Sequence, residues 1–464
     1  MLAAWRTVAQ RRQCPRAPAL LAAARHLASQ TAAASTQSAS VAAEVPSSSS
    51  GSEPSARLLS SSQQPEERMD FPGGSVPFTA AMSFLGGTFS PRAPLPCYRT
   101  IDSAGLAIAD ADIPHELDQE TAVKMYKTMV TLQTVDVIFY EAQRQGRFSF
   151  YMTSSGEEAT AIGSAAALTN DDVIFSQYRE QGVIMYRGFS VQDMAHQCFG
   201  NIHEQGKGRQ MPIHYGSKAL NFHTISSTLA TQLPHAVGAA YALKLQKRNA
   251  CAVAYFGEGA ASEGDFHAAL NFAATLKAPV VFICRNNGWA ISTPATDQYR
   301  GDGIAGRGPG YGMASLRVDG GDARAVYNAT AAARKIAVEQ QVPVLVEAMS
   351  YRSGHHSTSD DSSRYRAAEE MRQWRARDPV ARFQRWLVDQ GWWSDAQDTS
   401  ARQEARRDVI KALETAQKAP KPPLSAMFED VYARMPWHLE KQQAEVFAHV
   451  RTHPDACPAD IPVK

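Results

Sequence analysis

The sequence predicts an α/β fold in which a mostly parallel sheet is flanked by helices and followed by a helical C-terminal portion. Two apolar runs, at residues 251–256 and 279–284, have strand length and lack polar alternation, as expected for strands buried on both faces. The segment between them predicts a crossover helix, with an apolar stripe made of Phe266, Leu270, Ala273, Leu276 and, toward its edge, Phe272. Because such a crossover places both strand carboxyl ends on one edge of the sheet, the turns that follow should lie together, where ligands bind.

The composition is that of a globular protein with a sizeable core. The 464 residues are 44% hydrophobic and carry a formal net charge of +1, which gives no indication of nucleic-acid binding. No apolar run is long enough to span a bilayer. The six cysteines form no Cys-x-x-Cys pair, and Cys251 and Cys284 fall in predicted strands, so we expect reduced core thiols and neither a disulfide framework nor a zinc site.

The N-terminal region differs from the rest of the chain. Its first 43 residues contain no acidic residue but several arginines, a composition that favours a mitochondrial transit peptide over a plastid or secretory signal. With the serine-rich stretch that follows, residues 1–65 are predicted to be a transit peptide and a disordered linker. Residues 66–113 are predicted to form an extended arm, either draped over a neighbouring subunit or loosely packed, and residues 114–464 one domain. The expected location is the mitochondrial matrix.

Upstream of the two strands, helical periodicity begins after Pro114, and the run at 173–175 predicts a short strand. That strand ends at Tyr178 and Arg179. The guanidinium group of Arg179 could hold phosphate oxygens, although a structural salt bridge is the better explanation for this arginine taken alone.

The segment before the first apolar strand is polar. A loop at 200–217 contains Lys207 and Arg209, which could meet an anion or could equally face solvent. A helix is predicted to open at Thr224. Five hydroxyl-bearing residues and Gln232 crowd into its first nine positions, where N-capping needs only one or two. The surplus predicts an oxygen-lined cavity that could hold a monovalent cation.

Downstream of the second strand, the pattern continues to alternate between strands and helices. The glycine-dense segment 301–312 is predicted to be a loop, residues 315–320 a strand, and the alanine-rich run after Asp322 a helix. Residues 343–353 are predicted to contain a further buried strand. From residue 369 onward the chain is helical and charged, with tryptophans as apolar anchors.

The two turns after the apolar strands carry residues with specific chemistry. Glu258 and Asn287 offer the oxygen ligands that suit an octahedral Mg²⁺ bound to a diphosphate, and Gly257 and Gly259 allow close approach of an anion. Taken alone, Gly-Glu-Gly is better explained as an ordinary acidic turn. However, Glu258 and Asn287 stand 29 positions apart, and this spacing resembles the fingerprint of thiamine diphosphate enzymes.

Residues 66–464 resemble the α subunits of mitochondrial branched-chain 2-oxoacid dehydrogenases, the decarboxylating components of those complexes. The motifs that carry the resemblance are SQYREQG, TISSTLATQLP, YFGEGAASEGD, RNNGWAISTP, QYRGDGIAGRGPGYG and YRSGHHSTSDDSS. It implies a thiamine diphosphate-binding fold, decarboxylation of branched-chain 2-oxo acids, and transfer of the acyl group to a lipoyl arm. Pyruvate and acetoin dehydrogenase α subunits share the metal motif but resemble this chain less around GHHSTSDD.

The resemblance also implies roles for individual residues. The Mg²⁺ ligands would be Glu258, Asn287 and the carbonyl of Trp289. The residues that contact thiamine diphosphate would be Tyr178, Arg179, Ser227, Leu229, Gly257, Gly259, Ala260, Arg285 and His356. A structural K⁺ would be bound by Ser226, the carbonyl of Thr228, Thr231 and Gln232.

Three of these residues need comment. Thr228 stands where proline is usual and Trp289 where tyrosine is usual, but each should contribute through its backbone carbonyl. Leu229 would be a wedge that holds the cofactor bent. His356 is the candidate for proton transfer or charge stabilisation beside the substrate, with a diphosphate contact as the alternative role.

The resemblance implies several partners. A separate β subunit would supply the carboxylate that activates the aminopyrimidine, so the chain should work as two α plus two β subunits with a lipoyl acyltransferase core. A regulatory kinase and phosphatase would act on Ser357, where a phosphate brings a charge of roughly −1.5 to −2 beside His356. Thr358 is a weaker acceptor, and the second phosphorylation position of the family is Ala367 here.

Two other functions remain open at this point. One is a dehydrogenase α subunit for pyruvate or another 2-oxo acid. The other is a cofactor-free scaffold or regulatory subunit, which would require a damaged metal site, whereas Glu258 and Asn287 are both present.

Overall fold

The computed structural model describes residues 68–71, 74–77, 80, 82 and 94–463. The predicted transit peptide and linker at residues 1–65 lie outside them. Contacts divide the chain into two compact units, Met1–Ser90 and Pro91–Lys464. Within the first unit, β1 (Arg68–Phe71) and β2 (Gly74–Pro77) pair antiparallel. All other elements belong to the second unit.

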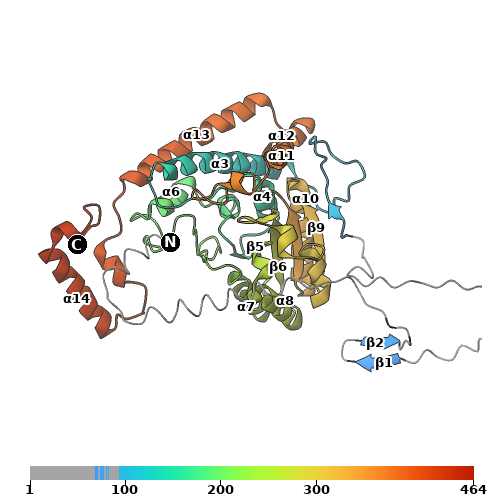
Figure 1. The fold of residues 1–464 in the computed structure, drawn as a ribbon, viewed down its shortest axis with the longest axis horizontal. Coiled ribbons are helices and arrows are strands. Elements are labelled where there is room, and N and C mark those ends of the chain that lie inside the picture. The colour runs from blue at the N-terminus through green and yellow to red at the C-terminus, as the bar shows by residue number, and fades with distance from the viewer. Residues whose placement is uncertain (1–67, 72–73, 78–79, 81, 83–93, 464) are drawn as a thin grey trace, which may run out of the picture. The chain divides into compact units, whose positions relative to one another are not determined.

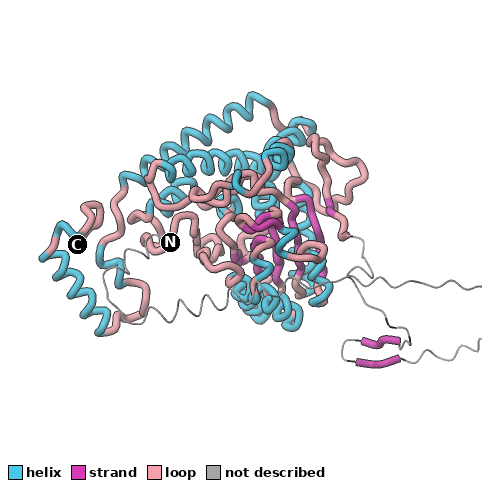
Figure 2. The backbone as a smooth tube through the Cα atoms, in the orientation of Figure 1, coloured by secondary structure: helices cyan, strands magenta, loops and turns pink. Residues whose placement is uncertain are grey.

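A six-stranded sheet is the centre of the second unit (Figures 1 and 2). Its order is β3-β9-β10-β6-β5-β4, and each neighbouring pair is parallel. The strands are β3 (Cys97–Tyr98), β4 (Val173–Phe175), β5 (Ala252–Gly257), β6 (Val280–Asn286), β9 (Ala314–Asp319) and β10 (Val344–Met349). A separate antiparallel pair is formed by β7 (Trp289–Ala290) and β8 (Thr293–Pro294).

Helices cover both faces of this sheet, with α3 and α4 on one side and α7 and α8 on the other (Figure 1). Those before β9 are α3 (Gln119–Arg144), α4 (Glu158–Ala166), α5 (Gln181–Tyr186), α6 (Val191–Phe199), α7 (Gln232–Leu245), α8 (Gly264–Leu276) and α9 (Ala295–Gln298). Those after β9 are α10 (Ala323–Gln340), α11 (Ala368–Arg375), α12 (Pro379–Asp389), α13 (Asp395–Lys418) and α14 (Trp437–Thr452). The predicted α/β fold with a parallel sheet and a helical C-terminal portion is confirmed.

The two layers of helices explain why the central strands lack polar alternation. Val253 and Tyr255 of β5 pack in the core that contains residues of α3, α4 and α10. Ala254 and Phe256 pack in the core that contains residues of α7 and α8. Because side chains of a strand alternate between faces, both sets must be apolar. The polar residues of β5 and β6 are thereby confined to their carboxyl ends.

The loop predicted for the glycine-dense segment is only partly correct. The sequence predicts a loop at 301–312, but residues Ala305–Tyr311 form a 3-10 helix, η2. Its turns are closed by short-range hydrogen bonds, such as that from Gly312 N to Pro309 O at 3.0 Å. A Cβ at Gly308 would lie 2.9 Å from the Cβ of Ser315. Gly308 therefore allows close packing of this segment against the following strand.

Two helix predictions also need correction. The sequence predicts a helix from Thr224, but α7 begins at Gln232 because Ala230 has a φ of +65°, which no right-handed helix contains. The hydroxyl-bearing residues therefore lie in a loop before the helix. Leu276, predicted on the buried stripe of α8, is 43% exposed because it is the last residue of the helix, and Phe272 at the edge of that stripe is 52% exposed.

Among the described residues, no helix is both long and apolar enough to cross a membrane. Cys251 and Cys284 are buried free thiols in or beside β5 and β6. Lys207 and Arg209 form ion pairs with Asp430, and Lys207 also pairs with Glu429. The domain boundaries predicted after residues 65 and 113 stay predictions.

Candidate functional site

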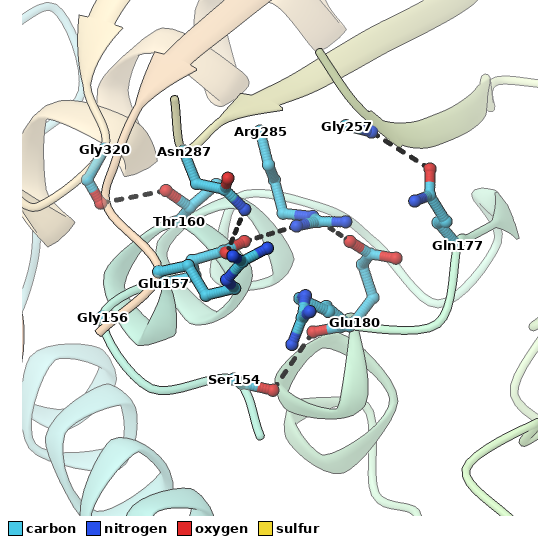
Figure 3. Close-up of polar contacts among 12 residues, drawn as sticks. Ser154, Gly156, Glu157, Thr160, Gln177, Glu180, Gly257, Arg285, Asn287 and Gly320 are labelled. Carbon is cyan, nitrogen blue, oxygen red and sulfur yellow. Dashed lines mark hydrogen bonds and ion pairs between the residues drawn. The ribbon is translucent and has the colours of Figure 1, made fainter. Parts of the chain in front are cut away.

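The parallel pairing of β5 and β6 brings the two polar turns together. Gly257 is in register with Arg285, so Glu258 and Asn287 follow directly at the same edge of the sheet. The backbone N–H of Asn287 donates to Oε2 of Glu258 at 3.3 Å. The side chain of Gln177, just beyond β4, accepts a hydrogen bond from Gly257 N at 3.0 Å (Figure 3). Three neighbouring strands thus fix the geometry of the turn.

A cavity of about 330 Å³ lies at this edge. All the residues that the sequence predicts to contact Mg²⁺ or thiamine diphosphate line it, together with four residues that it does not assign to the site: Gln177, Ala290, Ile291 and Arg352. The residues predicted to bind K⁺ lie outside its lining, in the adjoining loop and the first turn of α7. The cavity therefore unites segments that are as far apart in sequence as Gln177 and His356.

Glu258 is the acidic residue best suited to bind a cation there. It is 2% exposed, and its Oε1 has no hydrogen-bond partner within the described part of the chain. Burial raises the pKa of this carboxyl group. Leaving a buried carboxylate oxygen unpaired is costly, and a divalent cation would remove that cost. Asn287 and Trp289 border the same cavity, and the Trp289 carbonyl, which accepts from Arg352 Nη1 at 3.3 Å, has a second lone pair, so the donor set fits a magnesium ion.

Arg285 lies between two buried carboxylates (Figure 3). Its Nη1 pairs with Glu157 and its Nε pairs with Glu180, and all three side chains are almost fully buried. Burial alone would lower the pKa of Arg285, but the charges of Glu180 and Glu157 outweigh it and raise the pKa. Arg285 is therefore a permanent cation in the wall of the cavity.

Arg179 and Arg352 both face His356. Nη2 of Arg179 lies 3.0 Å from Nδ1 of His356 and donates to its carbonyl oxygen at 2.7 Å, and Nη1 of Arg352 lies 3.3 Å from the same Nδ1. Burial and the charges of Arg179 and Arg352 lower the pKa of His356 to about 3. The imidazole is therefore neutral near pH 7, with Nδ1 accepting and the proton on Nε2. It can donate a hydrogen bond as a neutral group.

The segment after β10 is held by hydrogen bonds. Asp360 Oδ2 accepts from His356 N at 2.8 Å and from the Tyr365 hydroxyl at 2.6 Å, and Arg352 Nη2 donates to the same hydroxyl at 3.0 Å. Ser357, the predicted phosphate acceptor, is only 9% exposed, and its Oγ accepts from Ser359 N at 3.3 Å. A kinase could reach this hydroxyl only if the segment opens.

The hydroxyl-rich loop before α7 is compact. Thr231 Oγ1 donates to the Thr228 carbonyl at 3.2 Å, and Thr228 N donates to Ser226 Oγ at 3.3 Å. Gln232 Nε2 donates to the carbonyl of Tyr255 at 2.9 Å, which leaves its Oε1 on the other side of the amide. The oxygens of Ser226, Thr228 and Thr231 thus lie close together, and hydroxyl and carbonyl oxygens suit a monovalent cation. The neighbouring Ser227 lies 2.7 Å from Nε2 of His214.

Sequence reasoning missed several residues of this site. Glu157 and Glu180 hold Arg285, and Gln177 holds the turn at Gly257. Gln177 and Glu180 flank the predicted Tyr178 and Arg179, and this proximity was a usable signal. Glu157 follows Gly156, whose φ of +90° marks a tight turn, but a single glycine does not reveal what the turn faces.

The dehydrogenase E1 component family matches residues 126–425 of this chain. The chain belongs to this family. The family depends on thiamine diphosphate, which fits a cavity lined by arginines and an unpaired carboxylate oxygen. Relatives include the 2-oxoisovalerate dehydrogenase subunit alpha 2, mitochondrial, of Arabidopsis thaliana, which is 54% identical over 85% of this chain and 83% of its own length. The 2-oxoisovalerate dehydrogenase subunit alpha, mitochondrial, of Homo sapiens is 51% identical over 88% of this chain and 93% of its own length. The subunit of the same name from Dictyostelium discoideum is 56% identical over 78% of this chain and 83% of its own length.

Proposed function

We propose that this chain is the α subunit of a mitochondrial branched-chain 2-oxoacid dehydrogenase. It takes part in the oxidative decarboxylation of branched-chain 2-oxo acids and in acyl transfer to the lipoyl arm of an acyltransferase core. The observation that carries the proposal is the cavity at the ends of β5 and β6, where the unpaired oxygen of Glu258 lies among arginines in a dehydrogenase E1 chain. The names of its relatives support the branched-chain substrate and the mitochondrial location.

Mg²⁺ is held by Glu258, Asn287 and the backbone carbonyl of Trp289. This assignment is supported by the position of all three on one cavity and by the orphaned oxygen of Glu258. The metal would supply a positive charge that neutralises and holds the diphosphate. Trp289 can replace the usual tyrosine because a carbonyl is common to every residue.

The diphosphate is held by Arg179 and Arg285 and by the amides of Gly259 and Ala260 at the start of a short 3-10 helix. Gly257 has no side chain and therefore leaves space for the diphosphate. A Cβ at Gly259 would lie 2.7 Å from the Cβ of Ala290, so this close turn requires glycine. Tyr178, Ser227 and Leu229 line the part of the cavity where the rings of the cofactor would lie.

When bound, thiamine diphosphate supplies the nucleophilic carbon and the electron sink for decarboxylation of a 2-oxo acid. The chain orients it through the arginines and wedges it with Leu229. His356 holds a proton at Nε2 and offers it as a neutral donor beside the substrate, while Nδ1 is occupied by Arg179. The low dielectric of the cavity strengthens each of these contacts.

K⁺ is bound by Ser226, the carbonyl of Thr228, Thr231 and Gln232. Its function is structural: it ties the loop that carries Ser227 and Leu229 to the start of α7. The proposal rests on the hydrogen bonds that hold Ser226 and Thr231 beside Thr228 and on the position of Gln232 directly after Thr231.

The protein works as two α plus two β subunits, and the β subunit supplies the carboxylate that activates the aminopyrimidine. A kinase and a phosphatase regulate it through Ser357. The word alpha in the names of the relatives supports a multi-subunit enzyme. Exposed apolar side chains on α8, at Phe272 and Leu276, are consistent with a subunit contact.

Kinetics of the purified αβ complex test the proposal. We expect kcat/KM for 3-methyl-2-oxobutanoate to exceed that for pyruvate by at least about tenfold, as for a pocket that rewards extra methyl groups. A preference for pyruvate would instead make the chain a pyruvate-type subunit. Calorimetry tests the non-enzymatic alternative, because a scaffold would show no Mg²⁺-dependent binding of thiamine diphosphate.

A further inference from the structure

Glu157 enters the site through a turn that only glycine permits. Gly156 has a φ of +90°, and a Cβ there would lie 2.1 Å from the carbonyl oxygen of Tyr351 and 2.7 Å from Ser353 Oγ. The turn is therefore pressed against the segment that follows β10. Glu157, directly before α4, is 1% exposed, and its carboxylate reaches the carboxyl end of β6.

Both oxygens of this carboxylate are used (Figure 3). Oε2 pairs with Nη1 of Arg285, and Oε1 accepts a hydrogen bond from Nδ2 of Asn287 at 2.7 Å. A carboxylate that is paired with a guanidinium group accepts hydrogen bonds without donating any, and Oε1 of Glu157 is the oxygen left for Asn287.

This property decides which end of the Asn287 amide faces which way. An asparagine amide has a donating nitrogen and an accepting oxygen, and the two ends can exchange by a half-turn of the side chain. A half-turn of Asn287 would place Oδ1 against a carboxylate oxygen in place of Nδ2, so repulsion would replace the bond of 2.7 Å. With Nδ2 on Glu157, Oδ1 faces the other way and also accepts from Trp289 N at 3.1 Å.

We infer that Glu157 is a positioning residue for the metal, which keeps Oδ1 of Asn287 turned toward it. The inference rests on the proposed function, in which Asn287 is a ligand of Mg²⁺. Glu157 touches neither metal nor cofactor in this role. It acts through Asn287, and partners of this kind commonly change metal affinity by about 10–100-fold.

Glu180 provides a matched control. It is equally buried and pairs with the same guanidinium group, through Nε of Arg285. No hydrogen bond among the residues described by the structure joins Glu180 to Asn287. Removing the carboxylate of Glu180 should therefore take one ion-pair partner from Arg285, as removing that of Glu157 does, while leaving the amide of Asn287 in place.

The test is a titration of the αβ complex with Mn²⁺ at saturating thiamine diphosphate, followed by the electron paramagnetic resonance signal of free Mn²⁺. We expect Glu157→Gln to raise the Kd for Mn²⁺ by about 10–100-fold and Glu180→Gln by less than about threefold. Glu157→Asp is a second variant that keeps a negative charge near Arg285 but withdraws the carboxylate from hydrogen-bond distance of Asn287. It should also weaken Mn²⁺ binding, and it keeps the inference testable if Glu157→Gln fails to fold.

The outcomes separate the inference from the proposed function. Failure of the wild-type complex to bind Mn²⁺ with thiamine diphosphate would overturn the proposed function itself. Wild-type binding with unchanged affinity in Glu157→Gln or Glu157→Asp would overturn only the inference. Equal losses in Glu157→Gln and Glu180→Gln would also overturn it, because Glu157 would then act through Arg285.

Discussion

The backbone N–H of Asn287 donates to Oε2 of Glu258 across 3.3 Å, so one oxygen of this carboxylate is anchored while Oε1 lacks a hydrogen-bond partner in the described chain. The two residues come from neighbouring parallel strands, and the sheet sets their separation. This arrangement prepares one free oxygen for a cation without any movement of the backbone.

Replacing Glu258 by glutamine should therefore weaken cofactor binding without destabilising the folded protein. We expect Glu258→Gln to weaken Mg²⁺-dependent binding of thiamine diphosphate by more than about tenfold, because a neutral amide is a poorer ligand for a hard cation. Without cofactor, the variant should be more stable by about 1 kcal/mol, because a buried carboxylate with one unpaired oxygen is removed. Calorimetry and thermal unfolding of the αβ complex measure the two effects. A variant that binds as well as the wild type would exclude Glu258 as a ligand.

Gly259→Ala should destabilise the turn that faces the diphosphate. The new Cβ would lie 2.7 Å from the Cβ of Ala290, an overlap that typically costs about 1–3 kcal/mol. Gly264→Ala is the control, because nothing lies within 4 Å of the position of its Cβ. It should be neutral or slightly stabilising at the start of α8. Thermal unfolding midpoints compare the two variants, and identical midpoints would contradict the predicted clash.

His356 should make the stability of the cofactor-free protein depend on pH. Its pKa is lowered to about 3 in the folded chain, so between about pH 6.5 and pH 3 the unfolded chain binds a proton that the folded chain does not. This contribution makes the wild type less stable as the pH falls through that window. His356→Gln lacks it, so its stability should fall less steeply between pH 7 and pH 5. Parallel pH profiles of the two proteins would show that His356 does not titrate in this way.

Ser357→Glu should stop acyl transfer by opening the segment after β10. Ser357 is 9% exposed, so a negatively charged side chain cannot stay at this position, and the segment must lose the hydrogen bonds around Asp360. Ser359→Glu is the control, because Ser359 is exposed two residues away. Reductive acylation of a lipoyl domain measures the result. Full activity of Ser357→Glu, or an equal loss in both variants, would sink the proposed regulation.

The edge of the sheet could be predicted from sequence because parallel strands obey a strict geometry. Once residues 251–256 and 279–284 are identified as buried strands joined by a helix, Glu258 and Asn287 must follow at one edge. The same logic places Arg179 beyond β4. These residues lie on the cavity because strand order and direction leave them no alternative.

The role of Glu157 could not be predicted in this way. Glu157 and Glu158 are identical neighbours after Gly156, and both are buried. Glu157 pairs with Arg285, whereas Oε2 of Glu158 accepts from Gly156 N at 2.8 Å within its own turn. Only the packing of that turn against Tyr351 decides which carboxylate reaches the site. Ser357 is similar, because it is 9% exposed in a segment whose order depends on hydrogen bonds of Asp360 with Tyr365 and of Tyr365 with Arg352, which no local pattern encodes.

Arg352 has a consequence that reaches beyond the cavity wall. Its Nη1 donates to the carbonyl of Trp289 at 3.3 Å and its Nη2 to that of Ile291 at 2.7 Å, while Nη2 also meets the Tyr365 hydroxyl. One side chain thus joins the β7–β8 hairpin beside the cavity to the segment that carries Ser357. Binding in the cavity and order in that segment are then linked equilibria with a single coupling free energy. If a covalent modification opens this segment and thereby weakens cofactor binding by some factor, bound cofactor must disfavour opening of the segment by the same factor.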